Sequence, residues 1–210
     1  MKVIIMAGGK QKRYEPSTPK QLIKIDGETL IERQITQFRS FGEVTVIADK
    51  PEFDFINDIN DIKLKKPSEN THELSKFMSS YDLWKDADGV IFVYGDSYIT
   101  DTGIEIINKM KDSDFCFFGT NNEMLALKVS RNYYEKFVAG INYIKILQDR
   151  DEGGLCGSWT LYRLLLGKDL IASIWYDHFC FIADESDDFD SEAQLQTWLE
   201  KYPTHTGSIS

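Results

Sequence analysis

Short apolar runs alternate along this chain with segments in which apolar residues recur every three or four positions. The runs predict buried strands, at 2–6, 44–48, 90–94, 114–118 and 124–129. The helical spacing predicts helices, at 30–38, 71–81, 104–110, 131–138, 158–166 and 191–201. Strands that alternate with helices are typical of an α/β protein whose sheet is covered on both faces.

Length and composition narrow this picture to one folded domain. The chain has 210 residues, 42% of them hydrophobic, so it can bury a sizeable core and is not a disordered chain. The three cysteines and three histidines are scattered and form neither a CxxC pair nor an HExxH motif. This argues against a disulfide framework and a zinc site. The small, polar tail at 204–210 is expected to fray.

The net charge of −10 changes the list of expected partners. Binding to DNA or RNA requires basic surface that neutralises phosphates, so nucleic acid is not expected as a partner. The apolar run at 3–7 is too short for a signal-peptide core or a membrane span. We therefore expect a cytoplasmic protein with no membrane partner.

The loop after the first strand carries the first candidate chemistry. Gly8 and Gly9 end that strand, and residues 10–24 contain five bases and a single acid, Glu15. Glycines let backbone N–H groups approach phosphate oxygens, so this local positive balance predicts a polyphosphate site. The loop matches neither the P-loop pattern nor GxGxxG. The alternative is an ordinary turn followed by solvated lysines.

Carboxylates supply the second and third candidates. Asp96 follows Gly95 at the end of the most hydrophobic strand, where ligands of open α/β sheets bind. Six acids and no base lie between 184 and 192, just before the last helix. One carboxylate from each place could hold Mg²⁺. The alternatives are a simple turn at Gly95-Asp96 and helix capping by Asp190 or Ser191.

Together these features resemble the nucleotidyltransferase superfamily with the nucleotide-diphospho-sugar transferase fold. The resemblance rests on three motifs. They are MAGGKQKRYEPSTPKQLIKIDGETLIER, from Met6 to Arg33, then Gly95-Asp96, and a C-terminal element from Asp188 to Leu195. The resemblance implies a three-layer, Rossmann-like fold with a mixed, mostly parallel sheet. It also implies a single domain over 1–203, with a nucleotide-binding half at about 1–112 and an acceptor-binding half at about 113–203.

The chain departs from the family pattern in two places. Gln11 stands where the loop usually has its second glycine, which changes the expected backbone contact to the triphosphate. The Pro-Glu-Asp of the C-terminal element is replaced by 192–194, Glu-Ala-Gln, which loosens the alignment there. Either Asp188 or Asp190 could therefore be the second metal ligand, and we choose Asp190 because it matches the second aspartate of the motif.

The resemblance also implies roles for individual residues. Arg13 would contact the β- and γ-phosphates, Lys20 would stabilise the α-phosphate during transfer, and Mg²⁺ would bind Asp96 and Asp190. The nucleotide would contact Ala7, Gly8, Gly9, Lys10, Gln11, Ser68, Asn70, Thr71 and Gly95. Ser68 to Thr71 could equally be an ordinary helix cap. The acceptor would contact Glu123, Arg150 and Asp188, for which the alternative is a surface loop.

These inferences predict a Mg²⁺-dependent nucleotidyltransferase. It would transfer a nucleoside monophosphate from an NTP to a small phosphorylated acceptor, a sugar phosphate by preference, and release pyrophosphate. The alternatives are a molybdenum-cofactor-type guanylyltransferase, a glycosyltransferase of the same fold, and a non-catalytic nucleotide-binding protein. A homodimer is compatible with the resemblance. The nucleobase, the acceptor and the pathway are not readable from the sequence.

Overall fold

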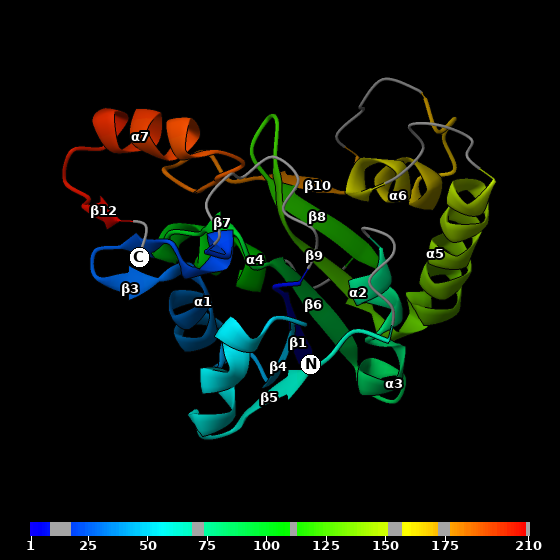
Figure 1. Cartoon of the computed structure of the whole chain (residues 1–210). Helices are drawn as coiled ribbons and strands as arrows, with labels where there is room; N and C mark the ends of the chain where they lie inside the picture. The colour runs from blue at the N-terminus through cyan, green and yellow to red at the C-terminus, as the bar shows by residue number, and fades with distance from the viewer. Residues whose placement is uncertain (9–17, 69–73, 110–112, 151–156, 172–176, 209–210) are drawn as a thin grey trace.

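The computed structural model describes residues 1–8, 18–68, 74–109, 113–150, 157–171 and 177–208, and its centre is a seven-stranded sheet (Figure 1). In spatial order the strands are β10 (Phe179–Phe181), β8 (Phe115–Gly119), β9 (Met124–Ser130), β6 (Gly89–Tyr94), β1 (Lys2–Met6), β4 (Glu43–Ile47) and β5 (Ile62–Lys65). Strand β9 is antiparallel to both of its neighbours, and the other pairs are parallel. The predicted mixed, mostly parallel sheet is therefore confirmed.

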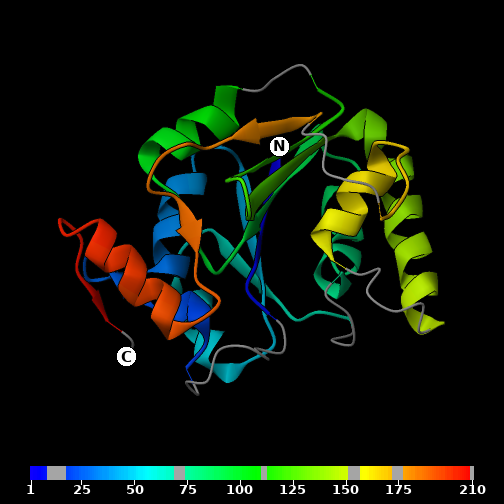
Figure 2. The ribbon, with the colours of Figure 1, turned by 90° about the horizontal axis from the view of Figure 1, so that it is seen from above.

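Helices cover both faces of this sheet and produce three layers (Figure 2). One face is covered by α1 (Leu30–Phe38), α4 (Asp101–Lys109) and the 3-10 segment η2 (Pro51–Asp58). The other is covered by α2 (Ser75–Met78), α3 (Tyr81–Trp84), α5 (Tyr134–Asp149) and α6 (Ser158–Leu165). Alternate residues of β1 explain this arrangement, because Val3 and Ile5 face the first group while Ile4 and Met6 face the second.

A cluster of aromatic side chains joins the sheet to the second helix layer. Phe92 of β6 is fully buried, and its ring stacks on that of Phe137 with centroids 5.4 Å apart. The rings of Phe77 and Trp84 meet Phe92 edge-on. These contacts fix α2, α3 and α5 against the strand that leads to Gly95-Asp96.

Two smaller sheets complete the fold and bear directly on the candidate site. One joins β7 (Ser97–Tyr98) to β11 (Asp187–Asp188), and the other joins β12 (Gly207–Ser208), β2 (Lys24–Ile25) and β3 (Glu28–Thr29). The remaining elements are η1 (Lys20–Leu22), η3 (Arg131–Tyr133) and α7 (Glu192–Lys201). Among the described residues, no helix is both long enough and apolar enough to cross a membrane.

Several elements differ from the sequence prediction. The described part of the predicted helix at 71–81 contains the short helix α2, and a second short helix, α3, begins at its last residue, Tyr81. The helix predicted at 131–138 begins as η3 and continues as α5 to Asp149. Strand β5 was not predicted, because Lys63 and Lys65 interrupt its apolar pattern at a sheet edge.

The tail also differs from the frayed segment that its composition predicts. Gly207 and Ser208 pair with β2, and the Thr206 amide donates a hydrogen bond of 2.9 Å to the Asp26 carboxylate. Backbone pairing and a carboxylate acceptor thus fix a segment that has few apolar side chains of its own. Residues 209–210 lie outside the described residues.

Gly119, at the end of β8, supports a stability prediction. A Cβ at this position would lie 1.9 Å from the Glu123 carbonyl oxygen, next to an irregularity in the β8–β9 register. We expect Gly119→Ala to destabilise the protein by about 1–3 kcal/mol, because backbone must shift to admit the methyl group. Urea unfolding measures this. The control is Gly140→Ala in α5, where the nearest atoms are 3.4 Å away or more, and it should be neutral or stabilising. Equal effects of the two substitutions would contradict the prediction.

Candidate active site

The carboxyl ends of β1 and β6 lie side by side because these two strands pair in parallel, with Met6 opposite Tyr94. The Gly95 amide continues that pairing with a 3.1 Å hydrogen bond to the Met6 carbonyl oxygen. A Cβ on Gly95 would lie 2.9 Å from the same oxygen and 3.1 Å from the Ala7 Cα. Glycine is therefore needed at position 95, where the two strand ends converge. Asp96 is the next residue in the chain.

The short β7–β11 pair brings the distant acidic segment to Asp96. Ser97 pairs with Asp188 in antiparallel register, so the chain after β6 runs beside the chain that leads to α7. Helix α7 begins after Ser191, whose hydroxyl accepts a hydrogen bond from the Gln194 amide. Ser191 is thus the cap, and the Asp190 carboxylate is directed toward Lys20.

Lys20 joins the two carboxylates that were predicted to bind metal. Its Nζ lies 2.9 Å from Asp96 Oδ2 and 2.9 Å from Asp190 Oδ1, and its side chain is only 10% exposed. Burial would lower the pKa of Lys20, but the two carboxylates outweigh it and raise that pKa above the ordinary value for lysine. Burial also opposes ionisation of Asp96, yet Lys20 and Lys76 hold the pKa of its carboxyl below the ordinary range.

The pKa of Asp188 is shifted in the opposite direction from that of Asp96. Burial, followed by the negative charges of Asp96, Glu123 and Asp190, raises the pKa of its carboxyl to about 8. Its Oδ1 is buried and has no hydrogen-bond partner among the residues that the structure describes. A carboxyl with a pKa raised in this way is largely protonated at neutral pH, and a cation bound beside it would favour its ionised form.

The donor chemistry of this cluster fits Mg²⁺. Asp96 and Asp190 offer oxygens that both reach one cation, the ammonium of Lys20, and Asp188 adds a buried oxygen that no described residue contacts by a hydrogen bond. Hard oxygen ligands of this kind suit Mg²⁺, which takes one or two carboxylates together with phosphate oxygens. Within the described residues, no group of three or more His, Cys, Asp or Glu side chains is already arranged as a metal site. Metal binding by Asp96 and Asp190 stays a prediction.

The expected nucleotide side is described only in part. Ala7 continues β1 with a 2.9 Å hydrogen bond to the Ile47 carbonyl oxygen, and the Lys76 ammonium donates to the Gly8 carbonyl oxygen. The Ser68 amide donates to Ser79 Oγ at 2.8 Å, which fixes Ser68 beside α2. The other predicted nucleotide contacts, and the Arg13 role, lie outside the described residues: Gly9, Lys10, Gln11, Arg13, Asn70 and Thr71.

A pocket of about 750 Å³ adjoins the carboxylate cluster. Its walls are the turn between β8 and β9, the segment 181–188 and one face of α7. Glu123 and Asp188, both predicted to contact the acceptor, line it. Arg150 does not. It is exposed at the end of α5, in the helix layer on the side of the sheet away from α7 (Figure 2).

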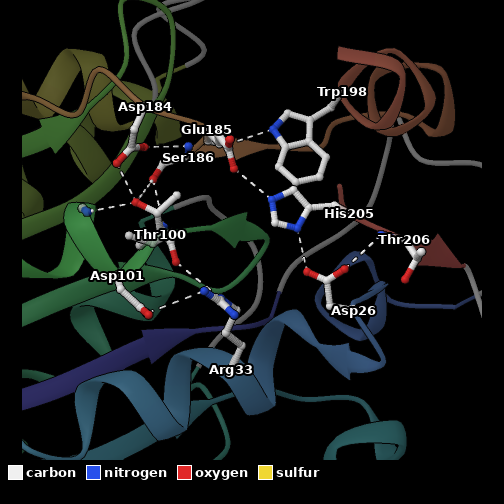
Figure 3. A network of polar contacts seen from close by, with 12 residues as sticks. Asp26, Arg33, Thr100, Asp101, Asp184, Glu185, Ser186, Trp198, His205 and Thr206 are labelled. Carbon is white, nitrogen blue, oxygen red and sulfur yellow. Dashed lines mark hydrogen bonds and ion pairs between the residues drawn. The ribbon is translucent and has the colours of Figure 1, made fainter. Parts of the chain in front are cut away.

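Sequence reasoning missed Lys76 and the contacts of the C-terminal segment. Lys76 contacts the Gly8 carbonyl oxygen and acts electrostatically on Asp96, yet a lone lysine on a helix gives no signal of that placement. The segment before β11 is fixed by Thr100, whose hydroxyl donates to Asp184 at 2.5 Å and accepts from the Gly103 amide (Figure 3). The Ser186 hydroxyl in turn accepts from the Thr100 amide at 3.0 Å.

His205 makes a second set of contacts to the same segment (Figure 3). Its ring lies between Asp26 and Glu185, and we call this group the His205 clasp. Its two ring nitrogens lie 2.6 Å from Asp26 Oδ2 and 2.8 Å from Glu185 Oε2, and its ring stacks on Trp198. The hydrogen bond to Glu185 is the largest cause that raises the pKa of His205, burial opposes it, and Asp26 adds to the rise. The clasp joins the β2–β3 turn, the segment before β11, and α7.

This clasp predicts a pH-dependent stability. The doubly protonated imidazole donates to both carboxylates, whereas the neutral ring donates to one. Because folding raises the pKa of His205, its contribution is complete below about 6.5 and is lost as pH rises through the higher folded-state pKa. We expect the melting temperature to fall by a few degrees over that window, and the His205→Gln variant to lack this part of the fall. Parallel pH profiles would contradict the prediction. Thermal unfolding at fixed ionic strength measures both proteins.

Comparison with known proteins identifies a relative, similar folds and a family for this chain. The bifunctional protein GlmU of Thermosipho africanus is 27% identical over 157 residues, which are 72% of this chain and 33% of that protein. The chain thus spans about a third of the length of this curated relative.

Two solved structures share the fold over nearly the whole chain. The CTP:phosphocholine cytidylyltransferase LicC of Streptococcus pneumoniae is similar with a TM-score of 0.58 and 16% identity, over 96% of this chain and 98% of that one. A putative glucose-1-phosphate thymidylyltransferase of Bacillus anthracis gives a TM-score of 0.67 and 12% identity, over 95% and 94%. These likenesses confirm the predicted α/β fold.

The family model called the MobA-like NTP transferase domain matches residues 3–141. The matched span is more than half of the chain, and it contains the loop after β1, Lys20 and Gly95-Asp96. It confirms the resemblance to nucleotidyltransferases and the enzyme class that follows from it. The chain therefore belongs to the MobA-like NTP transferase domain family.

Proposed function

We propose that this chain transfers a nucleoside monophosphate from an NTP to a small phosphorylated acceptor, a sugar phosphate by preference, with Mg²⁺ bound and pyrophosphate released. The observation that carries the proposal is the position of Lys20 between Asp96 and Asp190, at the carboxyl ends of β1 and β6. One cation and two carboxylates at this edge suit a reaction between two polyanions.

The proposed chemistry is mainly positioning and charge stabilisation. The acceptor phosphate attacks the α-phosphorus in line, one P–O bond forms, and the bond to the pyrophosphate leaving group breaks. No protein base is required, because a phosphate monoester with a second pKa of ~6 is already largely ionised at neutral pH. Lys20 would place its charge on the α-phosphate, where negative charge develops.

Asp96 and Asp190 are the residues that would hold the Mg²⁺. When bound there, the ion would supply positive charge that neutralises phosphate oxygens. Lys76 would support the nucleotide side by holding the Gly8 carbonyl oxygen, so that this strand end keeps its direction. Arg13 is proposed to contact the β- and γ-phosphates.

The pocket beside the cluster is proposed to receive the acceptor. Its volume of about 750 Å³ suits a small metabolite, and the carboxylates of Glu123 and Asp188 can accept hydrogen bonds from hydroxyl groups. A polyhydroxylated acceptor such as a sugar phosphate fits these partners. An enzyme that supplies activated sugars from metabolites and NTPs would work in the cytoplasm, and we include that location in the proposal.

A pyrophosphate-release assay tests the function directly. The four NTPs are combined with a panel of sugar and polyol phosphates in the presence of Mg²⁺, with EDTA as the control. We expect pyrophosphate to depend on both an NTP and an acceptor, and to disappear with EDTA. Release of a nucleotide from a nucleotide sugar, with no pyrophosphate from any NTP, would support a glycosyltransferase instead and contradict the proposal.

A further inference from the structure

One ammonium group occupies the position between the two proposed metal ligands. Lys20 Nζ is at the same distance, 2.9 Å, from Asp96 Oδ2 and from Asp190 Oδ1. The side chains of all three residues are largely buried, with exposed fractions of 10%, 23% and 16%. Little solvent is therefore available to screen a second cation from this ammonium.

We propose that Lys20 excludes free divalent cations from Asp96 and Asp190 until a nucleoside triphosphate binds. The inference rests on the proposed function, since the triphosphate is the anion that would draw Lys20 away. In the nucleotide-free protein Lys20 neutralises the carboxylates in place of a metal. When the polyphosphate arrives, the ammonium moves to a phosphate oxygen and the carboxylates accept the metal that the triphosphate carries. Only ion pairs are exchanged, and no covalent bond changes.

The surroundings of Lys20 permit this exchange. The residue lies in η1, and its long, flexible side chain can redirect the ammonium without a change of backbone. The strand end at Ala7, where the resemblance places the nucleotide, is packed directly against Gly95. A phosphate bound there would compete for Lys20 from the neighbouring strand end.

The charge of the cluster argues that some cation is always required. Asp188 pairs with Ser97, the residue after Asp96, and lines the adjoining pocket together with Glu123, so further carboxyl groups lie beside the pair. If Lys20 left without a replacement, the largely buried carboxylates of Asp96 and Asp190 would lose the cation that lies between them, which is unfavourable. Departure of Lys20 and entry of a metal are therefore coupled events.

Binding of Mn²⁺ in the absence of nucleotide tests the proposal without any measurement of turnover. Free Mn²⁺ is followed by electron paramagnetic resonance during titration of the wild-type chain, Lys20→Met and Lys20→Arg. The Lys20→Met substitution keeps the approximate length of the side chain and removes its charge. We therefore expect the Lys20→Met variant to bind Mn²⁺ at least tenfold more tightly than the wild-type protein. Arg keeps the charge and should stay within about threefold of wild type.

Lys76→Met is the matched control. Lys76 also acts electrostatically on Asp96 but is bonded to the Gly8 carbonyl oxygen. Its loss should change Mn²⁺ affinity by less than about threefold. A gain equal to that of Lys20→Met would show a general charge effect and overturn the proposal. Mn²⁺ binding by Lys20→Met no tighter than by wild type would also overturn it.

Two further measurements keep the test decisive. If circular dichroism shows that Lys20→Met does not fold, Lys20→Gln replaces it, because its amide can still donate to a carboxylate, and the same tenfold gain is expected. A mixture of the wild-type protein and a non-hydrolysable NTP analogue should bind Mn²⁺ more tightly than the analogue does without protein. An equal Mn²⁺ affinity in the two cases would overturn the proposed exchange of Lys20 for the metal. If pyrophosphate release fails while Lys20→Met still gains affinity, the proposed function is wrong and the exclusion of metal by Lys20 stands.

Discussion

Asp96→Asn should lower Mg²⁺-dependent pyrophosphate release by roughly 10³-fold. The substitution keeps the shape of the side chain and removes the charge that faces Lys20 at 2.9 Å. It takes away a proposed metal ligand and leaves Lys20 without one of its two carboxylates. The loss should appear in kcat at saturating Mg²⁺ and NTP, because the missing charge acts on the reacting phosphates.

The matched control for this prediction is Glu105→Gln. Glu105 is an exposed acid on α4 that pairs with Lys109 within the same helix, away from the carboxylate cluster. Its loss should leave turnover within about twofold of wild type, since exposed pairs of this kind contribute little. Circular dichroism establishes that both variants are folded. Unchanged turnover in a folded Asp96→Asn variant would remove Asp96 from the mechanism.

Lys20→Ala is expected to reduce kcat by about 10²–10³-fold while the KM for the NTP changes by less than about threefold. An ammonium directed at the α-phosphate stabilises charge that grows during transfer, so its loss affects the transition state more than the bound substrate. Lys20→Arg should recover part of the activity, because it restores the positive charge with a different shape.

Steady-state kinetics with varied NTP separate the two roles that Lys20 could have. A higher KM with an unchanged kcat would identify Lys20 as a contact made equally in the ground state and contradict the predicted role. Thermal unfolding of Lys20→Ala is measured alongside. The variant leaves two buried carboxylates without their cation, and a lower melting temperature is expected from that alone.

The central elements could be predicted from the sequence because local and long-range signals agree there. The apolar runs of β1 and β6 are buried on both faces of the sheet, as their composition indicates. Helix α1 begins at Leu30, directly after Thr29, which forms a capping box with Glu32, and its apolar residues face the sheet. The strand ends that carry Gly8 and Gly95 are adjacent for the same reason, since parallel neighbours end on one edge.

The elements that could not be predicted from the sequence are held by pairings between distant segments, which produce no recognisable pattern in the local sequence. Strands β7 and β11 have two residues each, too few to show a period of alternation. The tail beyond 203 looks like a loose end, yet its backbone and His205 find partners on β2 and on Glu185. The polar residues around Arg150 favour an acceptor loop, but in the structure Arg150 follows α5 and does not line the pocket beside Asp188.

The β7–β11 pairing also bears on when the protein can become active. Lys20 and Asp190 meet across 170 residues of chain, so closing that loop carries an entropic cost that the local elements of the first half do not bear. Contacts of this range are typically slow to form. During synthesis from the N-terminus, the strands up to β6 can be complete while Asp190 is still to come. The carboxylate pair is therefore assembled after the first strands of the sheet, and a chain released before Asp190 is made would hold only half of its candidate active site.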